Sequence, residues 1–288
     1  MSGRGTRAAV VVIAALAAIA TATAWIALRP GGTSRHYDRL VSTQDYLPGV
    51  AADVFVPATP RDHAPVVILV PGGAWRTAQR SGLAPLAETL AERGMTVVNA
   101  TYRAADSGAR FPEPVADIAC AIDFAVAQAR LEHVTPGPVV VLGHSSGAQL
   151  SSLAALEPAR FRAACPYPHV DPDGFIGLAG PYDLSEWQAV AAPMFTASPA
   201  QDRAQWKEAN PMTWVASRTG TAPLSVLLAH GDNDNDVSLG SSRNFAKALT
   251  DAGHHVQLTI VPGATHSSIY EPTVIADTIT TWIASLHQ

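Results

Sequence analysis

Short, mostly apolar runs alternate with longer amphipathic segments along most of the chain. The apolar runs predict buried strands at 66–70, 95–100, 138–143, 174–179, 224–229 and 256–261. The segments between them predict helices at 83–93, 111–130, 148–156, 239–252 and 272–286. Strands that are apolar on both faces are typical of parallel sheets with helices on both sides. The alternation therefore predicts an α/β fold with a doubly wound, mostly parallel sheet.

Two stretches near the start of this region have a different pattern, because polar and apolar residues alternate in them. Residues 38–44 and 50–56 flank Asp45-Tyr-Leu-Pro-Gly49, which has the residues of a turn. Alternation on both sides of a turn predicts an antiparallel hairpin. With the parallel strands, the hairpin makes an eight-stranded sheet, and 288 residues are enough for one large core of this kind.

One connection is much longer than the others. Residues 185–222 separate two predicted strands by more than a usual α/β connection. The segment contains large apolar side chains among polar ones: Trp187, Met194, Phe195, Trp206, Met212 and Trp214. Long insertions at the edge of such a sheet often form lids or pocket walls. We expect a short lid-like insertion here, and the alternative is a peripheral helical excursion with its own small core.

The N-terminal segment has a composition of its own. Residues 8–28 are apolar or small and carry no charge, with Arg4 and Arg7 before them and Arg29 after them. Such a run is long enough to cross a bilayer as a helix, and the preceding arginines favour export of the rest of the chain. An uncleaved signal anchor is one interpretation. Cleavage as a signal peptide is the other, because Ala22-Thr23-Ala24 fits the small-x-small rule.

These patterns divide the chain into three parts. Residues 1–28 are the predicted signal anchor or signal peptide, 29–36 a polar linker, and 37–288 the globular domain. That domain is predicted to lie outside the cytoplasm, either anchored to the membrane or secreted. Disulfides form in oxidising compartments outside the cytoplasm, so export makes Cys120 and Cys165 a candidate disulfide. The alternative is two separately buried thiols.

The charge of the chain bears on whether it binds nucleic acid. The formal net charge is −5, and Lys and Arg are spread evenly along the chain. A nucleic-acid-binding protein needs a basic face, so a nucleic-acid partner is not expected.

A candidate nucleophile follows the predicted strand 138–143. The chain there reads Gly143-His-Ser145-Ser-Gly147 and continues into the predicted helix. Strand, Gly-x-Ser-x-Gly turn and helix in this order form a nucleophile elbow, in which the serine hydroxyl is exposed above the sheet. Glycines flank the serine because the sharp turn leaves no room for side chains. Ser145 is therefore the predicted nucleophile.

A serine nucleophile needs a base and an acid, which in this chain order follow later strands. His266 follows the strand 256–261 and is the predicted base. The acid follows the strand 224–229, where Asp232, Asp234 and Asp236 compete and the pattern does not rank them.

The same three aspartates have the spacing that opens a calcium loop. That loop requires Gly at its sixth position and Glu at its twelfth, where this chain has Val237 and Arg243. No metal site is predicted. An oxyanion hole is expected in Pro71-Gly-Gly-Ala-Trp75, because this loop follows the strand 66–70 and its backbone can approach a substrate closely.

With these pieces in place, the chain resembles the carboxylesterase branch of the α/β-hydrolases, near the hormone-sensitive-lipase-like and feruloyl-esterase-like enzymes. The resemblance covers roughly residues 50–286. It rests on the elbow, on the loop 72–75, and on three further motifs: Gly180-Pro-Tyr-Asp-Leu184, His230-Gly-x-x-Asp234-x-x-Val237 and Pro262-Gly-Ala-Thr-His266.

The resemblance implies roles for individual residues. It implies that Asp234 is the acid, that the amides of Gly73, Ala74 and Ser146 form the oxyanion hole, and that Trp75 and Tyr182 contact substrate. Two positions depart from the family pattern, because Pro71 replaces a histidine and Ala74 replaces a glycine. An alanine amide can still serve the hole if its φ is negative.

The predicted function is a serine hydrolase that cleaves small-molecule carboxylic esters through an acyl-enzyme, using Ser145, Asp234 and His266 and no cofactor. Two alternatives remain open. One is an arylformamidase or peptidase-type amide hydrolase with the same residues. The other is an exported, non-catalytic binding protein on a hydrolase fold, because fold alone does not confer activity.

Overall fold

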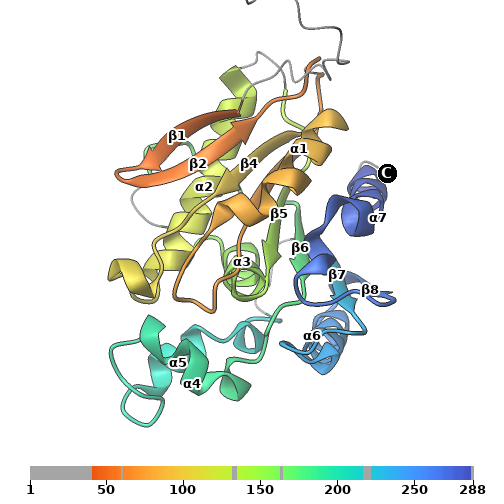
Figure 1. Cartoon of the computed structure of the whole chain (residues 1–288). Coiled ribbons are helices and arrows are strands. Elements are labelled where there is room, and N and C mark those ends of the chain that lie inside the picture. The colour runs from red at the N-terminus through yellow and green to blue at the C-terminus, as the bar shows by residue number, and fades with distance from the viewer. Residues whose placement is uncertain (1–40, 60, 132–134, 163–164, 217–221, 287–288) are drawn as a thin grey trace, which may run out of the picture. The chain divides into compact units, whose positions relative to one another are not determined.

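The strands form one mixed sheet in the computed structural model, which describes residues 41–59, 61–131, 135–162, 165–216 and 222–286. The strands are β1 (Val41–Leu47), β2 (Val50–Phe55), β3 (Val66–Val70), β4 (Thr96–Ala100), β5 (Val139–His144), β6 (Gly174–Leu178), β7 (Ser225–Gly231) and β8 (His255–Val261). Their order in the sheet is β1-β2-β4-β3-β5-β6-β7-β8 (Figure 1). Only β2 pairs antiparallel, with β1 and with β4. The predicted eight-stranded, mostly parallel sheet is confirmed.

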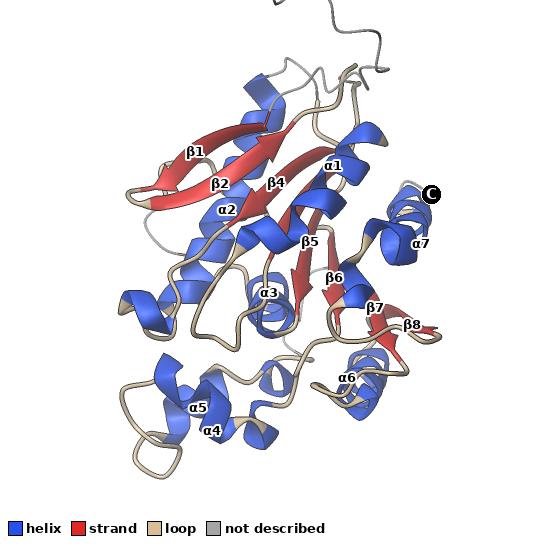
Figure 2. Cartoon of the chain, in the orientation of Figure 1, coloured by secondary structure: helices blue, strands red, loops and turns tan. Residues whose placement is uncertain are grey.

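Helices cover both faces of the sheet, as the alternation predicted (Figure 2). One face packs on α2 (Glu113–Leu131), α3 (Ser146–Leu156) and α6 (Leu239–Asp251), and the other packs on α1 (Ala84–Glu92) and α7 (Pro272–Ser285). Successive residues of one strand enter different cores, so that Ile68 joins the first core and Leu69 the second. This arrangement explains why β3 and β5 read as apolar runs, since both of their faces are buried.

The N-terminal hairpin has a tighter turn than we predicted. The expected turn over residues 45–49 is limited to Pro48 and Gly49, because β1 continues to Leu47 and β2 begins at Val50. Tyr46 is buried, and its packing in the core extends the strand beyond the predicted end. Gly49 has a φ of 73°, the left-handed conformation that glycine adopts readily after a proline in a tight turn.

The insertion lies beyond the carboxyl ends of β5 and β6 (Figure 1). Its described part consists of short helices: η3 (Leu184–Glu186), α4 (Gln188–Ala191), η4 (Ala192–Met194), α5 (Arg203–Glu208) and η5 (Pro211–Thr213). Phe195 and Trp206 stack with their ring centroids 3.8 Å apart, and Phe111 from the loop before α2 packs on Phe195 at 6.0 Å. The aromatic residues that marked this segment in the sequence therefore attach it to the main body.

A disulfide joins Cys120 of α2 to Cys165, which confirms the predicted pairing. The predicted anchor or signal peptide (1–28) and the linker (29–36) lie outside the described residues. Among the helices that the structure does describe, none combines the length and hydrophobicity needed to span a bilayer.

Candidate active site

Ser145 occupies the sharp turn between β5 and α3 (Ser146–Leu156), as the motif predicted. Its φ is 54°, and its backbone N–H donates to the carbonyl of Leu178 in the neighbouring strand at 2.9 Å. A Cβ atom at Gly143 or Gly147 would overlap backbone atoms, at Gly147 the carbonyl oxygens of Pro71 and Val70. The two glycines are therefore required by the close approach of strand, helix and neighbouring loop. This packing holds the serine in a conformation that non-glycine residues rarely adopt.

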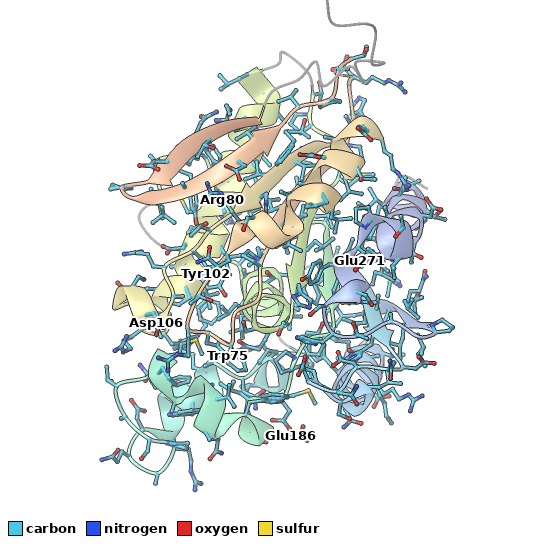
Figure 3. All side chains as sticks on the ribbon, viewed as in Figure 1. Trp75, Arg80, Tyr102, Asp106, Glu186 and Glu271 are labelled. Atoms are coloured by element: carbon cyan, nitrogen blue, oxygen red, sulfur yellow. A yellow bond between two sulfur atoms is a disulfide. The ribbon has the colours of Figure 1, made fainter. Side chains whose placement is uncertain are left out.

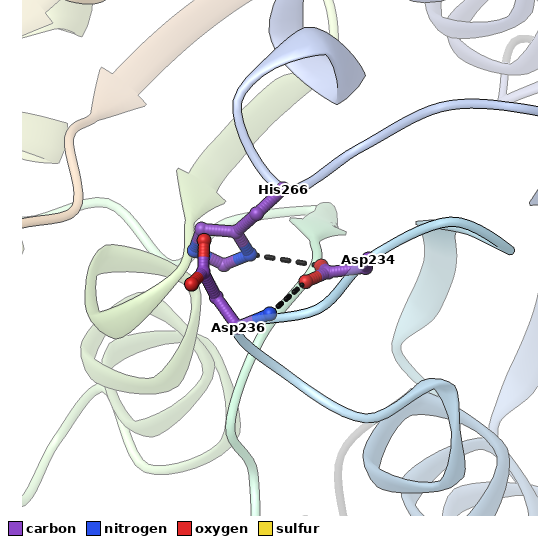
Figure 4. Close-up of side chains that lie close together, drawn as sticks. All are labelled: Asp234, Asp236 and His266. Carbon is purple, nitrogen blue, oxygen red and sulfur yellow. Dashed lines mark hydrogen bonds and ion pairs between the residues drawn. The ribbon is translucent and has the colours of Figure 1, made fainter.

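His266 and Asp234 reach Ser145 from two other loops at the same edge of the sheet. The Nε2 atom of His266 lies 2.9 Å from the Ser145 Oγ, and its Nδ1 lies 2.8 Å from Asp234 Oδ2 (Figure 4 shows the second contact). His266 follows β8 and Asp234 follows β7, so adjacent parallel strands deliver the base and the acid. The structure thus brings together the three residues proposed from the sequence.

The surroundings of Asp234 distinguish it from the other two aspartates of its loop. Its side chain is 1% exposed, and its Oδ1 accepts the backbone N–H groups of Asp236 and Val237, both at 2.9 Å. Burial raises the pKa of this carboxyl, but the hydrogen bonds from Val237, His266 and Asp236 outweigh burial and leave the pKa below its ordinary value. Asp232 instead accepts the N–H of Gly263 at 2.6 Å, and Asp236 is exposed.

His230 is a second histidine at the Asp234 carboxylate, although in the sequence it marks only the start of the acid loop. Its Nε2 lies 3.1 Å from Asp234 Oδ2 and 2.9 Å from the carbonyl of Val237, while its Nδ1 lies 2.8 Å from the Ser242 hydroxyl. Since both neighbours of Nε2 are acceptors, Nε2 carries the proton and Nδ1 accepts from Ser242. Burial lowers the pKa of His230, which keeps the ring neutral.

His144, the variable residue of the elbow motif, contacts the loop of the base. Its Nε2 lies 2.9 Å from the backbone carbonyl of His266, and its ring packs against the rings of His266 and Tyr270 with centroids 4.8 and 4.6 Å apart. Burial, with the neighbouring His266, lowers the pKa of His144 to about 3. The neutral ring donates Nε2–H to this carbonyl and braces the His266 loop. No local sequence signal indicated this role.

The predicted oxyanion loop passes directly against the nucleophile. A Cβ atom at Gly72 would lie 2.7 Å from the Ser145 Cβ, so only glycine allows this approach. Gly73 has a φ of 145°, and its carbonyl accepts the N–H groups of Arg76 and Thr77 at 3.0 and 3.1 Å. The negative φ that we expected of Ala74 is wrong, because its φ is 51°. The left-handed conformation leaves the backbone N–H of Ala74 in place, and the residue lines the cavity beside Ser145, so it stays a candidate donor for the hole. Trp75 follows with a φ of 60°, so two non-glycine residues in succession are left-handed.

A cavity of about 500 Å³ opens beside Ser145. Its lining includes Gly73, Ala74 and Ser146 of the predicted oxyanion hole and the predicted substrate contact Trp75. Apolar walls come from Leu83, Tyr270 and two residues of the insertion, Trp187 and Val190. The insertion therefore forms one wall of the cavity. Asp236 also lines the cavity, whereas no Lys or Arg of the described chain does.

Tyr182, the other residue expected to contact substrate, does not line this cavity. Its ring is fully buried and stacks on Phe245 with centroids 4.2 Å apart. Its backbone N–H donates to the Ser241 hydroxyl at 2.9 Å. The Gly180–Leu184 motif therefore attaches the start of the insertion to α6, and Tyr182 has a packing role.

Asp234, Asp236 and His266 are also the one group in the described chain whose side chains could together hold a metal ion, with ligand atoms within 4.8 Å of one another (Figure 4). Both oxygens of Asp234 already accept hydrogen bonds, and both ring nitrogens of His266 are engaged by Asp234 and Ser145. The three side chains are therefore not a free ligand set, and the geometry favours proton transfer over metal binding.

Known proteins resemble this chain in sequence. Residues 52–249 match the family model described as BD-FAE. A probable isoprenylcysteine alpha-carbonyl methylesterase, ICME from Oryza sativa subsp. japonica, is 26% identical over 231 residues, which are 76% of this chain and 55% of the relative. A probable carboxylic ester hydrolase, LipM from Mycobacterium tuberculosis, is 30% identical over 200 residues, or 65% of this chain and 45% of that protein. The chain thus spans about half the length of these curated relatives.

Solved structures share the fold. A truncated carbohydrate esterase from gut microbiota superposes with a TM-score of 0.73 at 19% identity, covering 85% of this chain and 93% of that one. Esterase 2 of Thermogutta terrifontis superposes with a TM-score of 0.66 at 20% identity, covering 85% and 90%. At these identities the likeness shows the fold alone, which is that of the α/β-hydrolases.

Proposed function

The chain belongs to the BD-FAE family, and from this membership and the geometry around Ser145 we propose that it is a serine hydrolase cleaving carboxylic esters through an acyl-enzyme. One observation carries the proposal. An unbroken hydrogen-bonded path runs from the Ser145 hydroxyl through His266 to the buried Asp234 carboxylate, at the side of a cavity. A nucleophile, its base and an orienting acid in contact are what acyl transfer requires.

The steps follow from the positions of the hydrogen atoms. Asp234 accepts the Nδ1–H of His266, so Nε2 is free to take the proton of Ser145 as its Oγ attacks the acyl carbon. The oxyanion is stabilised by the backbone amides of Gly73, Ala74 and Ser146. His266 returns the proton to the leaving alcohol, and water then releases the acid from Ser145 by the same path in reverse.

The residues that line the cavity indicate which kind of ester it would accept. Its apolar walls suit a neutral acyl or alkoxy group, and the Asp236 carboxylate, with no Lys or Arg of the described chain in the lining, disfavours anionic esters. Relatives with esterase names agree with an ester substrate in general terms. We propose uncharged esters that fit a cavity of about 500 Å³ as substrates of this chain.

Export is also part of the proposal. The Cys120–Cys165 disulfide supports it, because disulfides persist in oxidising compartments. Membrane attachment through residues 8–28 stays a prediction from the sequence.

A series of p-nitrophenyl esters from acetate to palmitate, with Ser145→Ala beside the wild type, tests the proposal. We expect turnover that depends on Ser145 and is highest for short chains, together with fluorophosphonate labelling of the wild type alone. Hydrolysis of an aryl formamide or a peptide, with esters untouched, would instead favour the amide-hydrolase alternative. A folded wild type with neither turnover nor labelling would contradict the proposal and favour the non-catalytic binding protein.

A further inference from the structure

Trp75 closes the predicted oxyanion loop, and its side chain is anchored in the interior. The indole is only 2% exposed, and its Nε1–H donates to the side-chain oxygen of Gln149 at 2.7 Å. The ring also contacts Trp187 of the insertion, with centroids 6.3 Å apart. Figure 3 shows Trp75 between the main body and the insertion. The loop therefore has a side-chain anchor directly after Ala74, the residue with the unexpected backbone conformation.

Gln149 lies on α3, four residues after Ser145, and its backbone N–H donates to the Ser145 carbonyl at 3.2 Å. Its side chain is fully buried. While its oxygen accepts from Trp75, its Nε2 donates to the backbone carbonyl of Ala209 at 2.7 Å. Ala209 belongs to the insertion, between α5 and η5. A single amide side chain thus connects the helix of the nucleophile, the oxyanion loop and the insertion.

The connection is needed because the loop has an unfavourable backbone. Ala74 and Trp75 both adopt left-handed φ values, which side-chain-bearing residues avoid. Such conformations persist only where surrounding contacts determine them. The indole N–H and the Ala209 carbonyl are held by Gln149 in a buried region, and removing the amide would leave both unpaired. The loop would then have little reason to keep its strained form.

We propose that Gln149 is a positioning residue that holds the oxyanion loop in its left-handed conformation, by binding Trp75 on one side and the insertion on the other. This inference rests on the proposed function. Gln149 does not touch the reacting atoms, so its effect is on the amides of Gly73 and Ala74. Because those amides act on the oxyanion that forms in the transition state, losing their alignment lowers kcat and leaves KM nearly unchanged.

The test replaces Gln149 with Met, which keeps a similar volume and removes both hydrogen bonds. With p-nitrophenyl acetate we expect kcat to fall by roughly 10- to 100-fold and KM to change by less than about threefold. The inhibition constant of a trifluoromethyl ketone, which forms an oxyanion on the serine, should rise by the same factor as kcat falls. Ser152→Ala is the matched control, because it removes a buried hydrogen bond of the same helix, from Ser152 Oγ to the Gln149 carbonyl. It should leave kcat within about threefold.

Trp75→Phe gives an independent route to the same bond, since phenylalanine keeps an aromatic ring at this position but has no N–H donor. If both residues act through this hydrogen bond, the double variant Trp75→Phe/Gln149→Met should be no slower than the slower single variant. Hydrogen exchange of residues 73–77 should also be faster in either variant, and this readout does not depend on turnover. If wild-type turnover depends on Ser145, but Gln149→Met changes neither kcat nor the hydrogen exchange of residues 73–77, the inference is wrong and the proposed function stands. Multiplying effects in the double variant would overturn it as well. An inactive wild type would contradict the proposed function only. The hydrogen exchange of residues 73–77 would still test whether Gln149 holds the loop.

Discussion

Asp234→Asn is the sharpest test of the site, because the structure dictates how the new side chain would sit. The Asp234 Oδ1 accepts two backbone N–H groups, from Asp236 and Val237, each at 2.9 Å. Only the oxygen of an asparagine amide can take that place, since an NH₂ group there would face two donors. The amide nitrogen is therefore directed at His266 Nδ1 and His230 Nε2, where Asp234 Oδ2 now lies.

This orientation reverses the hydrogen bond that prepares the base. An NH₂ donor at 2.8 Å from Nδ1 makes that atom an acceptor, so the proton of His266 moves to Nε2. Nε2 then cannot receive the proton of Ser145. A wrong tautomer of this kind lowers the rate by about 10⁴-fold, equivalent to roughly 5.5 kcal/mol in the activation free energy. The NH₂ group also faces the Nε2–H of His230, which should reduce the free energy of unfolding by about 1–3 kcal/mol.

The assay is kcat/KM with p-nitrophenyl acetate at pH 7.5, with thermal unfolding to confirm that each variant is folded. Asp232→Asn is the matched control in the same loop, because the asparagine oxygen can still accept the N–H of Gly263. It should keep kcat/KM within about fivefold of the wild type. An Asp234→Asn protein with more than a tenth of the wild-type value would refute the assignment. A larger loss in Asp236→Asn would assign the acid to Asp236 instead.

Three further predictions concern stability and the packing of the elbow. The folded protein keeps His144 neutral because its pKa is lowered to about 3, whereas the unfolded chain binds a proton there below about pH 6.5. The free energy of unfolding, measured by urea titration, should therefore fall by up to about 1.4 kcal/mol per pH unit as the pH decreases from 6.5 to 4. His144→Phe should remove this contribution, and an equal slope in both proteins would contradict the prediction. Gly147→Ala should abolish folding or Ser145-dependent activity, because the new Cβ would overlap the Pro71 carbonyl, and a stable, active variant would show that the loop moves freely. Replacing Cys120 and Cys165 with Ala should cost about 4 kcal/mol in the free energy of unfolding, from the 45 residues that separate them, and the variant should be insensitive to reductant where the wild type is not.

Local patterns were sufficient for much of the fold and for two residues of the site. Strands β3 and β5 could be predicted because residues buried on both faces form unbroken apolar runs. Ser145 and His266 were identified because each follows a predicted strand in a short segment with recognisable turn residues. The choice of Asp234 over Asp232 and Asp236 needed a family resemblance, because all three carboxylates lie in one loop and the strand pattern treats them alike.

The amino-acid sequence was thus enough for the strands, the helices between them, their mostly parallel arrangement and the residues at the ends of the strands, since each depends on neighbours along the chain. Three-dimensional packing was needed for the conformation of Ala74, the burial of Tyr182 and the contacts of His230, His144 and Gln149. The bond from Gln149 to Trp75 joins residues 74 positions apart, and a single polar side chain at such a distance leaves no periodic trace in the sequence. Its partner is chosen by how the helix, the loop and the insertion pack, and that packing is settled when the whole core forms.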